Sequence, residues 1–126
     1  MPPKPTFDTL DNEELEGACG GINMRLTQYG YRNDPNMDSY TRRGLGAYRH
    51  LSEDSLALTN SGLRALGLSR RDVTRREYWV DVYTKGGGVL HRRIDDRAPQ
   101  RSKRADLYMP HGFNRALGDY ADIRLA

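Results

Sequence analysis

A β-hairpin in the second half of the chain is the feature that most narrows the possible folds. In "YWVDVYT" (78–84), inward and outward positions alternate with a period of two, as in a strand with one buried face. "KGGG" (85–88) follows as a turn, and "VLHRRID" (89–95) follows as a second strand. Because a short glycine-rich turn joins neighbouring antiparallel strands, we predict a β-hairpin over these residues.

The remaining segments are short, and most of them have strand patterns. Alternating apolar residues predict a strand from Ile22 to Gly30, and "YADIRL" (120–125) predicts a last strand. Short helices are expected in "SGLRALGL" (61–68) and "PHGFNRALGD" (110–119). Many short strands, two small helices and glycine-rich turns together predict a mainly β protein, a small β-barrel with helical decorations.

Three aspartates lie at and after the end of the second hairpin strand. Ile94 and Asp96 share one parity, and Asp95 has the other. Because successive side chains of a strand point to opposite faces, we expect Asp96 at the end of an inward-facing row and Asp95 in solvent. Asp106 begins the next ordered segment, where it is expected to be a helix N-cap, a barrel-closing residue or a second functional acid.

Composition and charge limit the function. Hydrophobic residues make up 37% and charged residues 29% of the 126 residues, which suffices for one modest core. The net charge is only +3, and arginine pairs are scattered among acidic neighbours, which argues against nucleic-acid binding. The single cysteine, Cys19, excludes an intramolecular disulfide. No segment has the pattern of a signal peptide or a membrane span.

The chain divides into an arm and one domain. Residues 1–21 are rich in Pro, Gly and acidic residues and show no sustained periodicity. We therefore predict an N-terminal arm that contacts protein partners. Residues 22–126 carry the strand and helix patterns and form the predicted barrel domain.

From Trp79 onward the chain resembles a known group of barrels. A strand ending in "IDDRAP" (94–99) is followed by "RADLY" (104–108), a short helix and a last strand. This order is similar to the double-psi β-barrel domains of bacterial cell-wall enzymes. In rare-lipoprotein-A-like lytic transglycosylases the strand ends in Asn-Asp-Arg-Gly-Pro, from which Asp95 and Ala98 depart. "ADLYMPHG" (105–112) resembles a segment of membrane-bound lytic transglycosylase A. The resemblance implies a six-stranded double-psi β-barrel with short helices.

The resemblance also implies a site for peptidoglycan glycan strands. Asp96 matches the catalytic aspartate of the first group and Asp106 that of the second, so both stay open as the general acid/base of a lytic transglycosylase. Where the first group has a histidine, this chain has Thr59 and Asn60. The glycan contacts expected from the matching segments are Tyr29, Thr41, Asn60, Arg97 and Tyr108. No metal or other cofactor is expected, because the three histidines lack metal-ligand spacing.

Two other interpretations stay open beside the enzyme. The pattern around Asp96 equally fits a structural aspartate that binds turn amides or an arginine. In that case the chain would be a non-catalytic barrel that serves as a structural or interaction subunit of a virion, tail or secretion assembly. Nucleic-acid binding, suggested by the arginine pairs, is the third interpretation. The enzyme would act in the cell envelope or periplasm or as part of a virion, reached without a signal peptide.

Overall fold

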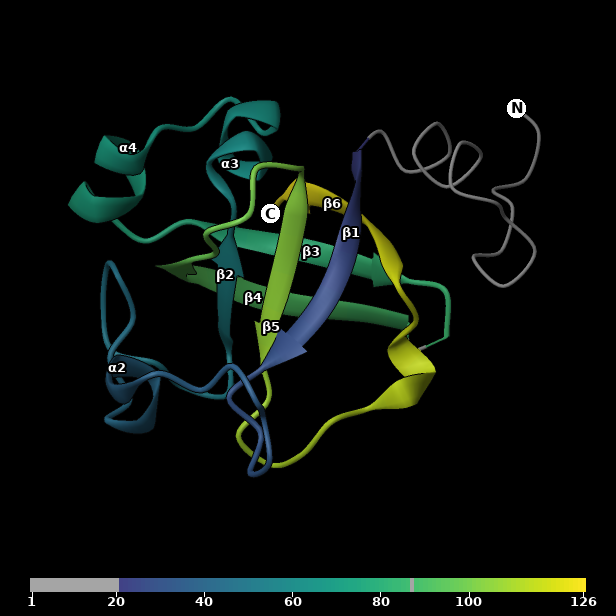
Figure 1. Cartoon of the computed structure of the whole chain (residues 1–126). Coiled ribbons are helices and arrows are strands. Elements are labelled where there is room, and N and C mark those ends of the chain that lie inside the picture. Colours follow the sequence, from purple (N-terminus) through teal and green to yellow (C-terminus); the bar gives the residue numbers. More distant parts are fainter. Residues whose placement is uncertain (1–20, 87) are drawn as a thin grey trace.

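Six strands form a closed barrel in the computed structural model, which describes residues 21–86 and 88–126 (Figure 1). The strands in chain order are β1 (Ile22–Tyr29), β2 (Ser55–Leu58), β3 (Trp79–Thr84), β4 (Gly88–Arg97), β5 (Arg104–Tyr108) and β6 (Tyr120–Leu125). The prediction of a mainly β, six-stranded barrel with short helices is confirmed. The arm predicted for residues 1–21 lies outside the described residues except for Gly21.

The order of the strands around the barrel has an internal two-fold relation. The order is β1-β5-β2-β4-β3-β6. The pairs β1/β5 and β2/β4 are parallel, and the other four pairs are antiparallel. Exchanging β1, β2 and β3 with β4, β5 and β6 maps β1/β5 onto β2/β4 and β1/β6 onto β3/β4, and it maps β2/β5 and β3/β6 onto themselves. The barrel thus contains two parallel strand pairs, and its six strands close on themselves as the fold prediction requires.

The hairpin predicted from the sequence is formed by β3 and β4. Thr84 pairs with Gly88 across the turn, and Trp79 pairs with Arg93 at the far end. The even-numbered positions of β3 are buried, as the alternation predicts. The core of the barrel consists of aliphatic side chains that are at most 2% exposed, among them Met24, Leu26, Leu56, Leu58, Val80, Val82, Ile94, Leu107 and Ile123.

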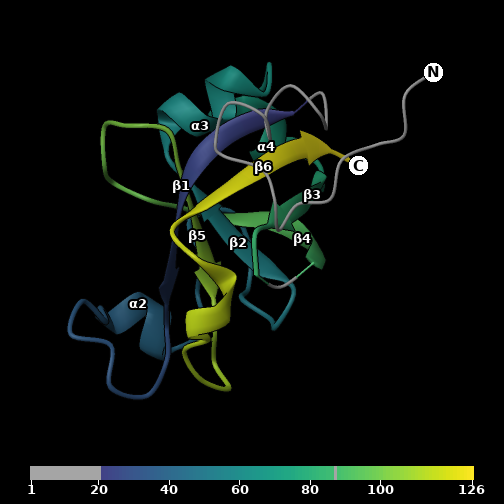
Figure 2. The same ribbon diagram turned by 90° about the vertical axis from the view of Figure 1, so that its right-hand side faces the viewer.

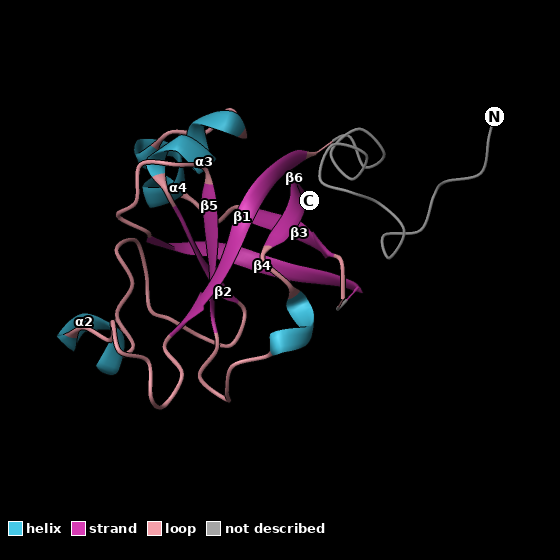
Figure 3. Cartoon of the chain, turned by 45° about the vertical axis from the view of Figure 1, so that its right-hand side comes forward, coloured by secondary structure: helices cyan, strands magenta, loops and turns pink. Residues whose placement is uncertain are grey.

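Short helices lie at the two ends of the barrel. α3 (Asn60–Ala65) and α4 (Arg70–Arg75) lie at one end, and α2 (Ser39–Arg42) lies at the other (Figures 2 and 3). α3 confirms the helix predicted in "SGLRALGL", although it begins one residue earlier. α4 was not predicted, yet its capping box, formed by Ser69 and Asp72, is a readable sequence signal. The helix predicted for residues 110–119 is only one 3₁₀ turn, η2 (Arg115–Leu117).

A β-bulge in β4 reverses the predicted environments of Asp95 and Asp96. Leu56 of β2 pairs with Ile94, and the next residue, Ala57, pairs with Asp96, so Asp95 is an extra residue on β4. Asp95 is completely buried, whereas Asp96 is partly exposed. The prediction of an inward Asp96 and a solvated Asp95 is wrong because an inserted residue changes the face of every residue that follows it.

Candidate functional site

One row of residues crosses four neighbouring strands. Thr27 of β1 pairs with Asp106 of β5, Asp106 pairs with Ala57 of β2, and Ala57 pairs with Asp96 of β4. Since adjacent strands are about 4.8 Å apart, the backbones of Asp106 and Asp96 are about 10 Å apart, with Ala57 between them. The small side chain of Ala57 leaves open space between the two carboxyl groups.

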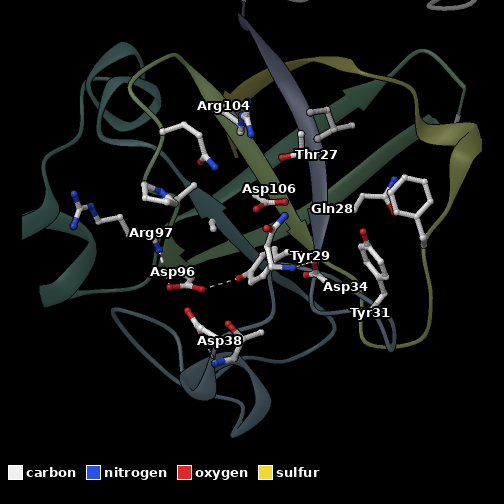
Figure 4. A pocket seen from close by; sticks show the side chains of 18 of the residues that line it. Thr27, Gln28, Tyr29, Tyr31, Asp34, Asp38, Asp96, Arg97, Arg104 and Asp106 are labelled. Atoms are coloured by element: carbon white, nitrogen blue, oxygen red, sulfur yellow. Dashed lines mark hydrogen bonds between the residues drawn. The ribbon is translucent and has the colours of Figure 1, made fainter.

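A pocket of about 490 Å³ opens over this row (Figure 4). Its volume falls within the range of roughly 300–1,000 Å³ that is typical of small-molecule sites. Its walls come from β1 and the loop that follows it, from α2, from the end of β4 and from β5. The charged side chains of the lining are Asp34, Asp38, Asp96, Asp106, Asp119, Arg97 and Arg104. The pocket is therefore acidic, although the whole chain is basic.

Asp106 is a partly buried carboxyl group in this pocket. It lies inside β5 and not before a helix, so its predicted N-cap role is wrong. Among the described residues its Oδ1 atom, which is shielded from solvent, has no hydrogen-bond partner. Burial raises the pKa of Asp106 to about 7, helped by the charges of Asp34 and Asp96 and opposed by the Thr27 hydroxyl and by Arg104. Near neutral pH, Asp106 is therefore a carboxylic acid for part of the time.

Asp96, at the left of Figure 4, is held by three hydrogen bonds. Its Oδ1 atom accepts from the backbone N–H groups of Ala47 (2.7 Å) and Arg97 (2.8 Å), and its Oδ2 atom accepts from the Tyr29 hydroxyl (2.9 Å). Both oxygens of Asp96 therefore have hydrogen-bond donors, whereas Oδ1 of Asp106 has none among the described residues. Asp96 and Asp106 line the same pocket, and they differ in how many partners hold them.

Tyr29 is the side-chain hydrogen-bond partner of Asp96. Burial, followed by the neighbouring Asp96, raises the pKa of Tyr29, so its hydroxyl keeps its proton and remains a donor to Asp96. Its ring packs against Tyr108, with centroids 5.5 Å apart. Tyr108 supports Tyr29 but is not among the lining residues of the pocket; it lines a separate, smaller pocket with Glu53 and His111.

The loop after β1 and helix α2 close one side of the pocket. Gly30, with a φ of 79°, lets the chain turn away from β1, and its N–H donates to Asp34. Asp38 is the N-cap of α2 and accepts from the backbone N–H of Thr41. Thr41 is buried and lines the pocket. Arg97, at the end of β4, also lines the pocket. Asp34 and Asp38 thus have structural partners in the backbone.

Asn60 is one of two predicted contact residues, with Tyr108, that do not line the pocket. It is the first residue of α3, and it is absent from the pocket lining. The pocket therefore gathers Asp96, Asp106, Tyr29, Thr41 and Arg97, and it leaves Asn60 and Tyr108 outside its lining. Sequence reasoning missed Asp34, Asp38 and the aromatic side chain of Phe113, because they lie in loops whose path the sequence pattern does not define.

A buried carboxylate, Asp95, and its hydrogen-bond and ion-pair partners form a cluster around the bulge in β4. Asp95 accepts hydrogen bonds from the Ser55 hydroxyl and from the Arg93 Nε atom (2.7 Å), and the Arg49 guanidinium lies 3.9 Å away. Its carbonyl accepts from the N–H groups of Tyr48 and Arg49. Gly46 packs so closely that a Cβ atom there would lie 2.5 Å from the Asp95 carbonyl oxygen. This cluster fastens the 44–50 loop to the barrel.

Comparisons with known proteins find no family model, no curated protein and no solved structure that matches this chain. Within residues 21–86 and 88–126, no group of three or more His, Cys, Asp or Glu side chains is arranged to hold a metal ion. None of the helices in this part of the chain is long and apolar enough to cross a membrane. The chemistry of the pocket therefore has to be judged from its own side chains.

Proposed function

We propose that the pocket binds a peptidoglycan glycan strand and that Asp106 cleaves it, as in a lytic transglycosylase. The observation that carries the proposal is the partly buried carboxyl group of Asp106, which faces an open pocket and has a pKa of about 7. A general acid/base is most effective when its pKa lies near the working pH. The resemblance of "IDDRAP" and "ADLYMPHG" to cell-wall double-psi barrels supports the choice of a glycan.

One carboxyl group suffices for this reaction. Protonated Asp106 donates its proton to the glycosidic oxygen as the C1–O bond of a muramic-acid residue breaks. The C6 hydroxyl of the same sugar then attacks C1, and its proton passes to the Asp106 carboxylate. The products are a shortened strand and a 1,6-anhydro end, no water is consumed, and Asp106 is again protonated.

The remaining side chains of the row serve that step. The charge of Asp96, together with that of Asp34, favours the protonated form of Asp106. Asp96, about 10 Å away across two strands, also suits a sugar that lies between the two carboxyl groups. Arg97 and Arg104 supply donors for sugar hydroxyls and acetamido oxygens.

Digestion of purified sacculi followed by mass spectrometry tests the proposal. The wild-type protein is expected to release anhydro-muropeptides, with a rate that falls as the pH rises above about 7 and Asp106 loses its proton. Asp106→Asn removes the acid but keeps the shape, and we expect a loss of about 10²- to 10⁴-fold. Asp54→Asn, an exposed carboxyl group outside the pocket, is the matched control and should keep the wild-type rate. Absence of anhydro products from wild type at every pH from 4 to 8 would contradict the proposal.

A non-catalytic barrel within a virion, tail or secretion assembly is the second candidate. It is supported by the backbone hydrogen bonds of Asp34, Asp38 and Asp96, which give most of the pocket carboxyl groups a structural task. This candidate predicts a stable assembly of several chains or partners. A strict monomer in size-exclusion chromatography with light scattering, combined with active cleavage of sacculi, would rule it out.

A further inference from the structure

An aromatic wall stands on one side of the pocket. Tyr31 lies to the right of Asp106 in Figure 4, on the side away from Asp96 and Arg97. The ring of Phe113 meets that of Tyr31 edge to face, with centroids 5.3 Å apart, and both side chains line the pocket. Phe113 is 52% exposed, so half of a large apolar side chain faces solvent at the mouth of the pocket. The two aromatic rings together give the pocket an apolar wall that a ligand can cover.

The loop that carries Phe113 is fastened on both sides of this residue. Before it, the Met109 N–H donates to the Tyr29 carbonyl (2.8 Å). After it, Gln28 and the Asn114 backbone exchange two hydrogen bonds, both 2.8 Å long: the Gln28 amide donates to the carbonyl, and its oxygen accepts from the N–H. The Asn114 side chain also caps η2. Phe113 is therefore held in place before any ligand arrives, which lowers the entropy cost of binding.

The lining of the pocket defines the ligand that fits this wall. Five carboxyl groups against two arginines make the pocket repel phosphates, which disfavours a nucleotide. A sugar ring carries no phosphate, has an apolar C–H face that can cover an aromatic ring, and has hydroxyl groups at its edge that can bind carboxylates and guanidinium groups.

We propose that Phe113 and Tyr31 form a subsite for one N-acetylhexosamine ring next to Asp106, and that Gln28 is the positioning residue that holds Phe113 there. The subsite rests on the proposed function of the pocket, and it deepens that function by naming the side chains that set the position of the glycan. The ring covers Phe113, and the next glycosidic bond along the strand then lies over Asp106.

Binding of chitotetraose, the β-1,4-linked tetramer of N-acetylglucosamine, tests the subsite without cleavage. Isothermal titration calorimetry is carried out on the Asp106→Asn protein, so that binding is measured apart from turnover. Adding Phe113→Ala should weaken binding about tenfold or more, whereas Phe113→Tyr, which keeps the ring, should stay within about twofold. Leu125→Ala removes a similarly exposed apolar side chain outside the pocket and should leave the affinity unchanged.

A double-mutant cycle tests the positioning role of Gln28. Gln28→Ala should weaken binding severalfold, and Gln28→Ala combined with Phe113→Ala should bind no more weakly than Phe113→Ala alone. A merely structural Gln28 would instead give additive losses. Thermal melts of all variants confirm that they are folded before binding is compared.

The outcomes separate this inference from the proposed cleavage. Chitotetraose binding that depends on Phe113, together with no release of anhydro products from sacculi, would support the subsite and reject the lytic reaction. Absence of chitotetraose binding to the Asp106→Asn protein, or equal affinity with and without the Phe113 ring, would overturn the subsite even if sacculi were cleaved.

Discussion

Asp95 and Asp106 lie on the two strands that flank β2, yet their surroundings are opposite. Asp95 is completely buried, and it is bound by a hydroxyl group and two arginines. Asp106 is partly buried, and one of its oxygens has no hydrogen-bond partner among the described residues. Asp95 is the more deeply buried of the two carboxyl groups, but in the described part of the chain only Asp106 of the two has a carboxyl oxygen without a hydrogen-bond partner. The partners of a carboxyl group, more than its depth, therefore separate a structural residue from a candidate catalytic one.

The largest effect on stability is expected at Asp95. Asp95→Asn keeps the shape but removes the fully buried charge that pairs with the partly exposed guanidinium groups of Arg93 and Arg49. Arg93 keeps the more distant carboxylate of Glu77, 3.9 Å away. Breaking one partner of a buried ion pair costs about 3–5 kcal/mol of unfolding free energy. Urea unfolding monitored by circular dichroism measures it. A loss below about 1 kcal/mol would show that the charge of the Asp95 side chain contributes little to stability.

The same substitution at Asp106 is expected to act in the opposite direction and to depend on pH. The pKa of Asp106 is about 7 in the folded protein, against about 3.9 in an unfolded chain, so the folded state binds the extra proton between these values. Stability of the wild type should therefore fall as the pH rises from about 4 to about 7, and remain constant above that.

Asp106→Asn removes this dependence on pH. Relative to the wild type, the variant should gain roughly 2–4 kcal/mol in unfolding free energy between pH 4 and pH 8, as about three pKa units imply. Urea unfolding of both proteins at several pH values is the measurement. Parallel stability profiles for the two proteins would mean that Asp106 is solvated, and the contrast with Asp95 would disappear.

The smallest effect is expected at Asp96, the neighbour of Asp95 across the bulge. Tyr29→Phe removes one of the three hydrogen bonds of Asp96 and leaves the two backbone donors in place. We expect a loss of about 1 kcal/mol in unfolding free energy, since Asp96 is partly exposed and water can replace the hydroxyl group. If Tyr29→Phe lost as much unfolding free energy as Asp95→Asn, Asp96 would depend on its partners as strongly as the fully buried Asp95 does.

The sequence predicted the parts of this comparison that depend on local pattern. The alternation around Val80 and Val82 defined the hairpin, because buried and exposed positions of a strand repeat every two residues. Asp96 and Asp106 were identified as partners in one site, and the structure places both in one pocket. The β-barrel class followed from the short strands and glycine-rich turns.

The parts that depend on the register between distant strands could not be predicted. The bulge at Asp95 is defined by its pairing with β2, some forty residues away, and alternation within β4 carries no sign of it. The place of Phe113 in the pocket was missed for a similar reason: Gln28, on the first strand, holds the loop that carries Phe113. Long-range contacts of this kind leave no periodic signal in a single sequence.

The strand order also has a consequence for how the protein folds. Every strand of the first half, β1 to β3, has only strands of the second half, β4 to β6, as its neighbours. A fragment that ends at the hairpin turn would therefore contain no strand pair of this barrel. The barrel can therefore fold only when both halves of the chain are present. Because all of its strand pairs except the β3/β4 hairpin are between residues far apart in sequence, we expect slow folding with little partial structure. The pocket shares this property, because Tyr29 and Thr27 come from one half and Asp96 and Asp106 from the other.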